Sequence, residues 1–152
     1  MTKQSLSKRA LSLILLGAGI TRFPWARRLV FKTCDARNLW GDAASRSGVG
    51  SNLEQTEKLR SWLPVIFKEL KITSLVDVPC GDGYWIRRID DLELDSYVGV
   101  DIVLEMIREL EENAPPRWSY ACFDATDAVL PRADALLCRD LPSRSLRMLT
   151  DA

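Results

Sequence analysis

The sequence predicts an α/β fold built on a doubly wound parallel sheet, of which about four strands are present. Two observations support this prediction. Short apolar runs alternate with stretches of helical periodicity, as expected for parallel strands joined by crossover helices. A glycine-containing turn follows the first apolar run directly, where a sheet of this kind leads from strand into helix. With 152 residues, 47% of them hydrophobic, the chain can bury one core.

The first strand is predicted over residues 74–78, an apolar run that ends at Pro79. The chain then turns through residues 80–83, and the spacing of apolar side chains predicts a short helix from Tyr84. Such a strand–turn–helix unit points free backbone N–H groups at a nucleotide-like ligand. Asp77, just before the turn, favours a ligand with a positive charge or an amino group. The alternative is an ordinary turn in which the glycines only relieve backbone strain.

The second strand is predicted over residues 96–101 and also ends in an acid. Asp101 lies 24 residues after Asp77 in the chain. An acid at the tip of the second strand, roughly 20 residues beyond a glycine turn, is placed to accept hydrogen bonds from ribose hydroxyls. The two acids together therefore favour a ligand site over a plain turn.

The remaining body contains one clear helix and two further strands. Val103, Met106, Ile107 and Leu110 form a single apolar stripe, which indicates a helix packed on the core. Strands are predicted over residues 118–123 and 133–138. Asp124 closes the third strand, where a turn cap is the alternative to a ligand contact. The fourth strand leads into the pair 139–140, Arg-Asp, at the edge where parallel sheets place active-site residues.

Residues 1–37 are predicted to form a basic helical arm, with one helix over 5–16 and a second from Pro24. Trp25, Leu29 and Val30 are expected on the buried side of the second helix. Residues 1–46 hold nine Lys/Arg and two Asp/Glu, net +7, whereas residues 47–152 hold twelve and nineteen, net −7. This arm would suit contact with anionic lipid, nucleic acid or the protein's own acidic surface; simple solvated charges are the alternative.

Between arm and sheet, residues 40–51 are predicted to be a loop rich in Gly, Ser and Arg. Ser51 and Glu54 have the spacing of a capping box, which predicts a helix that starts there and runs through Phe67. Pro64 is expected to kink or restart this helix, because proline lacks an N–H.

Composition excludes several kinds of chemistry. The chain has no His, so His-based acid–base catalysis and His metal sites are excluded, and no metal site is predicted. Its four cysteines show no C-x-x-C spacing and are expected to be reduced core residues in a cytoplasmic protein.

The apolar run 11–16 is too short for a bilayer span of roughly 20 residues. A cleaved signal peptide is the alternative there, although no small-x-small cleavage site follows.

The pattern Asp77-x-Pro79-Cys80-Gly81-Asp82-Gly83, followed by residues 97–101, resembles motifs I and II of the class I S-adenosylmethionine-dependent methyltransferases. Proline stands where the first glycine of motif I is usual. A bacterial subgroup of this superfamily reads D-x-P-C-G-D and has W-G and S-R-S-G-x-G-S upstream. Those elements are present here at residues 40–41 and 45–51, and the resemblance covers about residues 38–140.

The resemblance implies the S-adenosylmethionine-binding half of a Rossmann-like domain over residues 38–140, followed by an irregular tail over 141–152. It implies that S-adenosylmethionine is the cofactor and that a small molecule or saccharide accepts the methyl group, with no nucleic acid partner. The basic arm would at most contact a membrane surface. The residues implied to bind the cofactor are Arg46, Asp77, Pro79, Cys80, Gly81, Gly83, Asp101, Ile102, Asp124, Ala125 and Arg139. Asp140 is the candidate general base.

Beyond Asp140 the sequence departs from the subgroup, which continues with a Cys-Leu-Val-His-Leu-type segment. A class I sheet has seven strands, so a truncated or frame-shifted reading frame is one hypothesis. The alternative function is then a non-catalytic remnant that binds cofactor weakly or not at all. A nicotinamide-dependent oxidoreductase is disfavoured, because it expects G-x-G-x-x-G where Asp82 and Trp85 would crowd a pyrophosphate.

Overall fold

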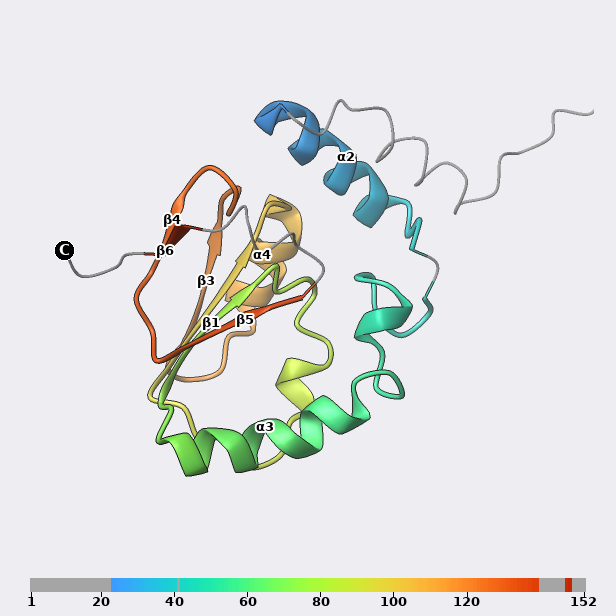
Figure 1. Cartoon of the computed structure of the whole chain (residues 1–152). Coiled ribbons are helices and arrows are strands. Elements are labelled where there is room, and N and C mark those ends of the chain that lie inside the picture. Colours follow the sequence, from blue (N-terminus) through green and yellow to red (C-terminus); the bar gives the residue numbers. More distant parts are fainter. Residues whose placement is uncertain (1–22, 41, 140–146, 149–152) are drawn as a thin grey trace, which may run out of the picture.

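The computed structural model describes residues 23–40, 42–139 and 147–148, and its centre is a parallel four-stranded sheet (Figure 1). The strands lie in the order β3-β2-β1-β5. Their bounds are β1 Ser74–Val78, β2 Ser96–Asp101, β3 Trp118–Cys122 and β5 Ala135–Cys138. The chain moves outward from β1 to β3 and then returns to the other side of β1. This order confirms the predicted Rossmann-like α/β class.

The register of the sheet brings the carboxyl ends of the strands to one edge. Asp77 of β1 pairs with Gly99 of β2, and Asp101 pairs with Cys122 of β3. On the other side of β1, Val78 pairs with Cys138 of β5. The acids at the ends of β1 and β2 therefore lie side by side at the edge where open α/β sheets hold their ligands.

Two helices cover one face of the sheet. They are α3, Glu57–Leu70, and α4, Leu104–Glu112. The predicted stripe of α4 is confirmed, because its four apolar side chains are buried. The core on this face consists of Leu63, Phe67, Leu75, Cys80, Trp85, Ile86, Leu94, Tyr97, Ile107, Leu110 and Tyr120.

The segment after β3 covers the opposite face. Its short strand β4, Val129–Leu130, places Leu130 in a second core with Val76, Val78, Val100 and Ala125. β4 also pairs with β6, Arg147–Met148, within the tail that was predicted to be irregular. The rest of that tail lies outside the described residues. Along β1, Leu75 packs in the first core and Val76 and Val78 pack in the second, so both faces of the sheet are covered by apolar side chains, as is usual for a parallel sheet.

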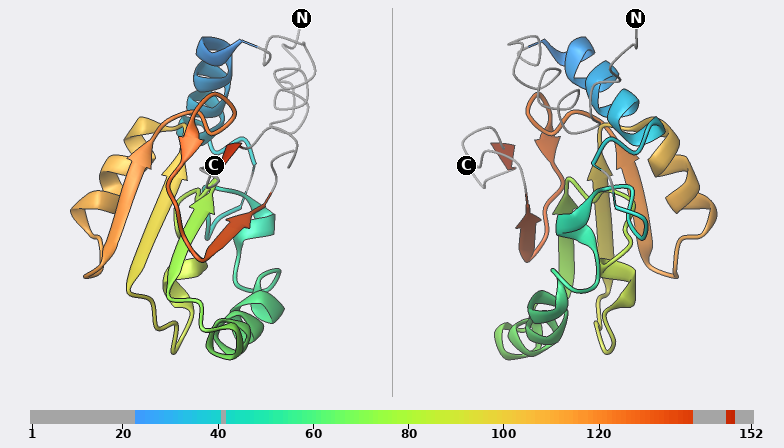
Figure 2. Two further views of the ribbon diagram at one scale, coloured as in Figure 1. Left: turned by 60° about the vertical axis from the view of Figure 1, so that its left-hand side comes forward. Right: turned by 90° about the vertical axis from the view of Figure 1, so that its right-hand side faces the viewer.

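The helix α2, Pro24–Ala36, crosses above the carboxyl edge of the sheet (Figures 1 and 2). Val30 is buried as expected, but Trp25 and Leu29 are exposed, so the predicted buried side of this helix is wrong. Ala26 and Cys34 pack inward with Val30 instead. Val30 and Cys34 form a small apolar cluster with Leu39 and Trp40, which joins the helix to the loop that follows it. The predicted helix over residues 5–16 lies outside the described residues.

The helix predicted from Tyr84 is also wrong, because only one 3₁₀ turn forms there, η3, Ile86–Arg88. Trp85 and Ile86 are buried in the core, as the spacing indicated. The turn ends at Ile89, whose backbone is extended, and Asp91 then adopts a positive φ of 60°.

The predicted capping box does not form either. Ser51 ends the short 3₁₀ helix η2, Val49–Ser51, and α3 begins only at Glu57. Asn52 explains the delay, because its side-chain oxygen accepts a hydrogen bond of 2.9 Å from the Gln55 N–H and holds a local turn. Pro64 lies inside α3, which continues to Leu70 without restarting.

Gly99 in β2 leaves no room for a side chain. A Cβ there would lie 2.6 Å from a ring carbon of Tyr120 and 3.1 Å from the sulfur of Cys80. Gly99→Ala is therefore expected to destabilise the protein by about 1–3 kcal/mol through overpacking, measured by urea unfolding. Gly50→Ala is the matched control, because its Cβ would meet only the end of Arg139 at 3.8 Å. Equal stabilities of the two variants would contradict this account of the core.

Candidate ligand site

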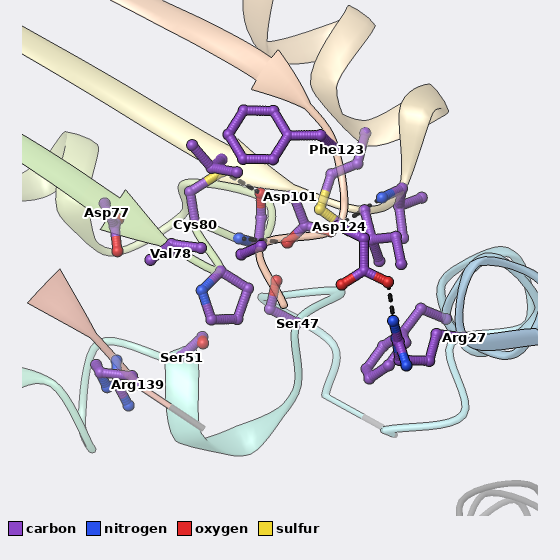
Figure 3. A pocket seen from close by; sticks show the side chains of 18 of the residues that line it. Arg27, Ser47, Ser51, Asp77, Val78, Cys80, Asp101, Phe123, Asp124 and Arg139 are labelled. Atoms are coloured by element: carbon purple, nitrogen blue, oxygen red, sulfur yellow. Dashed lines mark hydrogen bonds and ion pairs between the residues drawn. The ribbon is translucent and has the colours of Figure 1, made fainter. Parts of the chain in front are cut away.

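A cavity of about 280 Å³ opens at the carboxyl edge of the sheet, between the glycine turn and α2 (Figure 3). The turn supplies its floor, and side chains from β1, β2, the segment after β3 and α2 supply its walls. Its lining residues are Arg27, Phe31, Trp40, Ser47, Ser51, Asp77, Val78, Pro79, Cys80, Gly81, Trp85, Val100, Asp101, Ile102, Val103, Met106, Phe123, Asp124, Ala125, Thr126 and Arg139.

Asp77 is the most deeply buried acid of the cavity, with 2% of its surface exposed. The Tyr97 hydroxyl donates a hydrogen bond of 2.8 Å to its carboxylate. Burial raises the pKa of Asp77 to about 7, although the Tyr97 hydrogen bond and the charge of Arg139 act to lower it. A carboxyl group whose ionised form is so poorly solvated is well suited to bind a cationic group, which would restore its charge.

Asp101 ties the glycine turn to the start of α4. Its two carboxylate oxygens accept hydrogen bonds of 3.0 Å each, one from the Gly81 N–H and one from the Val103 N–H. Burial raises the pKa of Asp101, and these backbone hydrogen bonds oppose the rise. Each oxygen keeps a second lone pair, so the carboxylate can also accept from ligand hydroxyl groups.

Asp82 joins the glycine turn to the loop at residues 45–47. Its carboxylate accepts from the Ser45 hydroxyl at 3.0 Å, the Arg46 N–H at 2.8 Å, the Ser47 hydroxyl at 3.2 Å and the Tyr84 N–H at 3.1 Å. In return, the Asp82 N–H donates to the Ser47 hydroxyl at 2.8 Å. The two sequence motifs, S-R-S and G-D-G, are therefore halves of one hydrogen-bonded unit.

Gly81 allows this loop to lie against the turn. A Cβ at Gly81 would come within 2.2 Å of the Ser47 oxygen, and the residue has a φ of +59°. Glycine is favoured at such a position because it has no Cβ and adopts positive φ without strain. Ser47, which the turn holds in place, lines the cavity.

Arg46, which the resemblance assigned to the cofactor, does not line the cavity. Its guanidinium donates to the Glu109 carboxylate at 2.6 Å, and its Nε lies 3.4 Å from the Asp35 carboxylate. It thus links the loop to α4 and α2. Arg139 does line the cavity, toward the end at which Asp77 lies. It donates to the Gly50 carbonyl at 2.6 Å and lies 5.2 Å from the centre of the Trp85 ring.

Asp124 lies at the other end of the cavity, beside α2 (Figure 3). Arg27 forms an ion pair of 2.7 Å with Asp124 and another of 2.7 Å with Asp127. Burial alone would raise the pKa of Asp124, but hydrogen bonds from Thr126 and Arg27 outweigh it and lower the pKa. Asp124 is therefore an ionised acceptor whose Oδ2 is already paired to α2.

Most of the residues singled out from the sequence meet at this cavity. Those that line it are Asp77, Pro79, Cys80, Gly81, Asp101, Ile102, Asp124, Ala125 and Arg139. Arg46 and Gly83 are not part of its lining, and Asp140 lies outside the described residues. Other lining residues were not predicted from the sequence, among them Arg27, Phe31, Ser51 and Phe123. Arg27 and Phe31 are one helical turn apart, but that spacing alone does not indicate which face of α2 lies on the body.

These features define a Rossmann-like domain with a ligand cavity at the carboxyl ends of β1, β2 and β3. No family model matches the chain, and no curated protein matches it. Among solved structures, it is similar to the plantazolicin methyltransferase BamL, crystallised with a triazolic desmethylPZN analog and SAH. The two are 15% identical with a TM-score of 0.46, over 85% of this chain. The chain spans 44% of the length of that protein.

Proposed function

We propose that this protein binds S-adenosylmethionine in the cavity and transfers its methyl group to a small-molecule or saccharide acceptor. The observation that carries the proposal is the order of charged groups along the cavity. Asp77 and Arg139 lie toward one end, Asp124 lies at the other, and Asp101 lies between them (Figure 3). This order matches a ligand with an amino acid group, a ribose and an adenine in sequence.

The amino acid group of the ligand carries one positive and one negative charge, so the end of the cavity that holds it needs one anionic and one cationic side chain. Asp77 is proposed to accept from the α-ammonium group, since its present hydrogen-bond donor is the neutral Tyr97 hydroxyl. Arg139 is proposed to hold the carboxylate, because a guanidinium pairs with a carboxylate through two hydrogen bonds. This assignment replaces Arg46, whose side chain is paired with Glu109 and Asp35.

The part of the cavity around Asp101 is suited to the nucleoside of the ligand. Asp101 is proposed to accept from the ribose hydroxyls, which its spare lone pairs allow. The Phe123 and Met106 side chains line the cavity there and offer apolar surface for a purine ring. Asp124 Oδ1 already accepts from both the N–H and the hydroxyl of Thr126, whereas Oδ2 accepts from Arg27 and keeps a second lone pair for an exocyclic amine. The cavity volume is close to the lower end of the roughly 300–1,000 Å³ typical of small-molecule sites.

When bound, S-adenosylmethionine would supply an electrophilic methyl group: the acceptor would attack the methyl carbon in line with the C–S bond, and the neutral thioether S-adenosylhomocysteine would leave. The protein's part is to hold both reactants and to exclude water. Asp77 and Arg139 fix the amino acid group, and the apolar wall on the β2–α4 side shields the centre. Asp140, next to Arg139 in the chain, is proposed as general base for an acceptor that must lose a proton. The class of acceptor, a small molecule or a saccharide, is proposed from the resemblance of the sequence to the bacterial methyltransferase subgroup.

The test is isothermal titration calorimetry of the full chain with S-adenosylmethionine. Asp101→Asn is expected to weaken binding by about 1–3 kcal/mol, because the charge is lost and the single amide oxygen can accept from only one of the Gly81 and Val103 N–H groups. Asp90→Asn is the control, since Asp90 is exposed and does not line the cavity. Equal affinity of Asp101→Asn and wild type would contradict the ribose assignment. Saturable binding without methyl transfer would favour the non-catalytic alternative.

A further inference from the structure

The outward face of α2 exposes large apolar side chains that the site does not use. Trp25 is 66% exposed and Leu29, one turn later, is 58% exposed. Both lie opposite the buried side of the helix, which consists of Ala26, Val30 and Cys34. The Phe23 ring stacks beside Trp25 with 6.3 Å between ring centres. Apolar side chains gathered on one exposed helix face usually mark an interaction surface.

The charge of the same region is strongly positive. Arg28 lies between Trp25 and Leu29 on the exposed side, and Arg37 follows the end of the helix. The first 46 residues carry a net charge of +7, whereas the rest of the chain carries −7. Within the described part of this segment, Arg27, Lys32 and Arg46 are paired with acids, whereas Arg28 and Arg37 are exposed beside the apolar face. An anionic surface would therefore be contacted through Arg28 and Arg37, and the acidic remainder of the chain would be repelled. This charge separation would orient the protein on such a surface with α2 facing it.

We propose that the outward face of α2 is a docking surface for an anionic lipid membrane. Aromatic and leucine side chains beside Arg or Lys are the composition of helices that lie in the plane of a membrane interface. Trp25 and Leu29 would enter the boundary between headgroups and acyl chains, and Arg28 would contact anionic headgroups. Among the described residues, no helix is long and apolar enough to cross a bilayer, so the contact is peripheral.

Docking by α2 has a consequence for the cavity. Arg27 and Phe31, on the side of α2 that faces the body, line the cavity. A membrane bound to the opposite side of the same helix would therefore lie one helix diameter from the site, about 10 Å. This consequence rests on the proposed function, and it favours an acceptor that is carried at a lipid surface. The docking itself is independent of what the cavity binds.

Vesicle sedimentation of the full chain, without S-adenosylmethionine, tests the docking alone. Binding is expected to vesicles of equimolar phosphatidylcholine and phosphatidylglycerol, and to fall at high salt and on phosphatidylcholine vesicles. The double variant Trp25→Ser/Leu29→Ser is expected to bind at least about tenfold more weakly, because both apolar anchors are lost. Trp62→Ser is the matched control, since Trp62 is 62% exposed on α3, away from α2.

Tryptophan fluorescence supplies a second readout. The emission of the wild type is expected to shift to shorter wavelength on anionic vesicles, and Trp25→Phe is expected to bind but to lose this shift. Circular dichroism of each variant establishes that it is folded. Absence of vesicle binding, equal loss in Trp62→Ser, or indifference to lipid charge would overturn the proposal. Binding to single-stranded RNA such as polyuridylate, without vesicle binding, would overturn it in favour of a nucleic acid partner.

Discussion

Asp77→Asn is expected to stabilise the protein at pH 8 relative to wild type while it weakens binding of S-adenosylmethionine. The pKa of Asp77 rises from 3.8 to about 7 on folding, chiefly because the carboxyl is buried. The folded state therefore holds this proton more tightly than the unfolded state. The stabilisation from that proton is complete below about pH 4 and is lost as the pH rises to about 7. Asparagine carries no charge and can still accept from Tyr97, so it avoids this loss.

The size of the effect follows from the linkage. Each pKa unit corresponds to about 1.4 kcal/mol, so between pH 5 and pH 8 the stability of Asp77→Asn relative to wild type should rise by about 2–3 kcal/mol. Urea unfolding at the two pH values measures this difference. Asp134→Asn is the control, because hydrogen bonds from Thr73 and Ser74 lower the pKa of Asp134, so its titration lies below about pH 4 and its difference from wild type should not change between pH 5 and pH 8. A stability difference between Asp77→Asn and wild type that does not change with pH would contradict a raised pKa of Asp77 in the folded protein.

The same carboxyl makes ligand binding depend on pH. A cationic ligand binds the ionised form of Asp77, so wild-type affinity should rise about tenfold from pH 6 to pH 8 as the ionised fraction grows. Asp77→Asn should bind about 2–3 kcal/mol more weakly at pH 8, the range for a lost charge-assisted hydrogen bond, with no such rise. Calorimetry at both pH values measures the two effects. A variant that is less stable at every pH would instead indicate a purely structural role.

Asp82→Ala is expected to destabilise the protein by about 3–4 kcal/mol, because one carboxylate holds four donors from the loop and the turn. Its loss leaves the Ser45 hydroxyl and the Arg46 N–H without their acceptor. Urea unfolding measures the stability, and limited digestion with trypsin should show faster cleavage after Arg46 as the loop opens. Ligand affinity should fall as well, since Ser47 lines the cavity.

Two variants bracket this result. Asp82→Asn keeps one acceptor oxygen and should be intermediate in stability. Asp127→Ala removes an exposed partner of Arg27 and should cost less than about 1 kcal/mol, as surface ion pairs usually do. If Asp82→Ala were no less stable than Asp127→Ala, the hydrogen-bonded unit of loop and turn would not be the element that shapes the site.

Local patterns were sufficient where a segment makes its contacts with its own neighbours or with a uniform apolar layer. The strands β1 and β2 have the predicted bounds, and the α4 stripe is buried as expected. The pattern was insufficient where polar groups compete for the same backbone. Asn52 delays the start of α3 by holding a turn, and the 3₁₀ turn after Trp85 ends where Ile89 becomes extended. Neither effect is visible in hydrophobic periodicity.

The candidate site shows the same division. Acids at strand ends could be placed from the sequence, because the register of a parallel sheet brings strand ends to one edge. The ion-pair partner of each charged side chain could not be predicted from the sequence. Both Arg46 and Arg139 were predicted to bind the cofactor, and only the approach of α2 and α4 to the 45–47 loop pairs Arg46 with Asp35 and Glu109.

The amino acid sequence by itself determined the parallel sheet, the glycine turn and the row of acids at its edge, because these depend on local periodicity and backbone geometry. The tertiary structure alone decided that α2 closes the cavity with Arg27, that its Trp25 face is exposed, and that Arg139 is the cation at the far end. The physical reason is that ion pairs and helix faces depend on which segments meet in space, and contacts between residues about 90–100 positions apart leave no trace in local patterns.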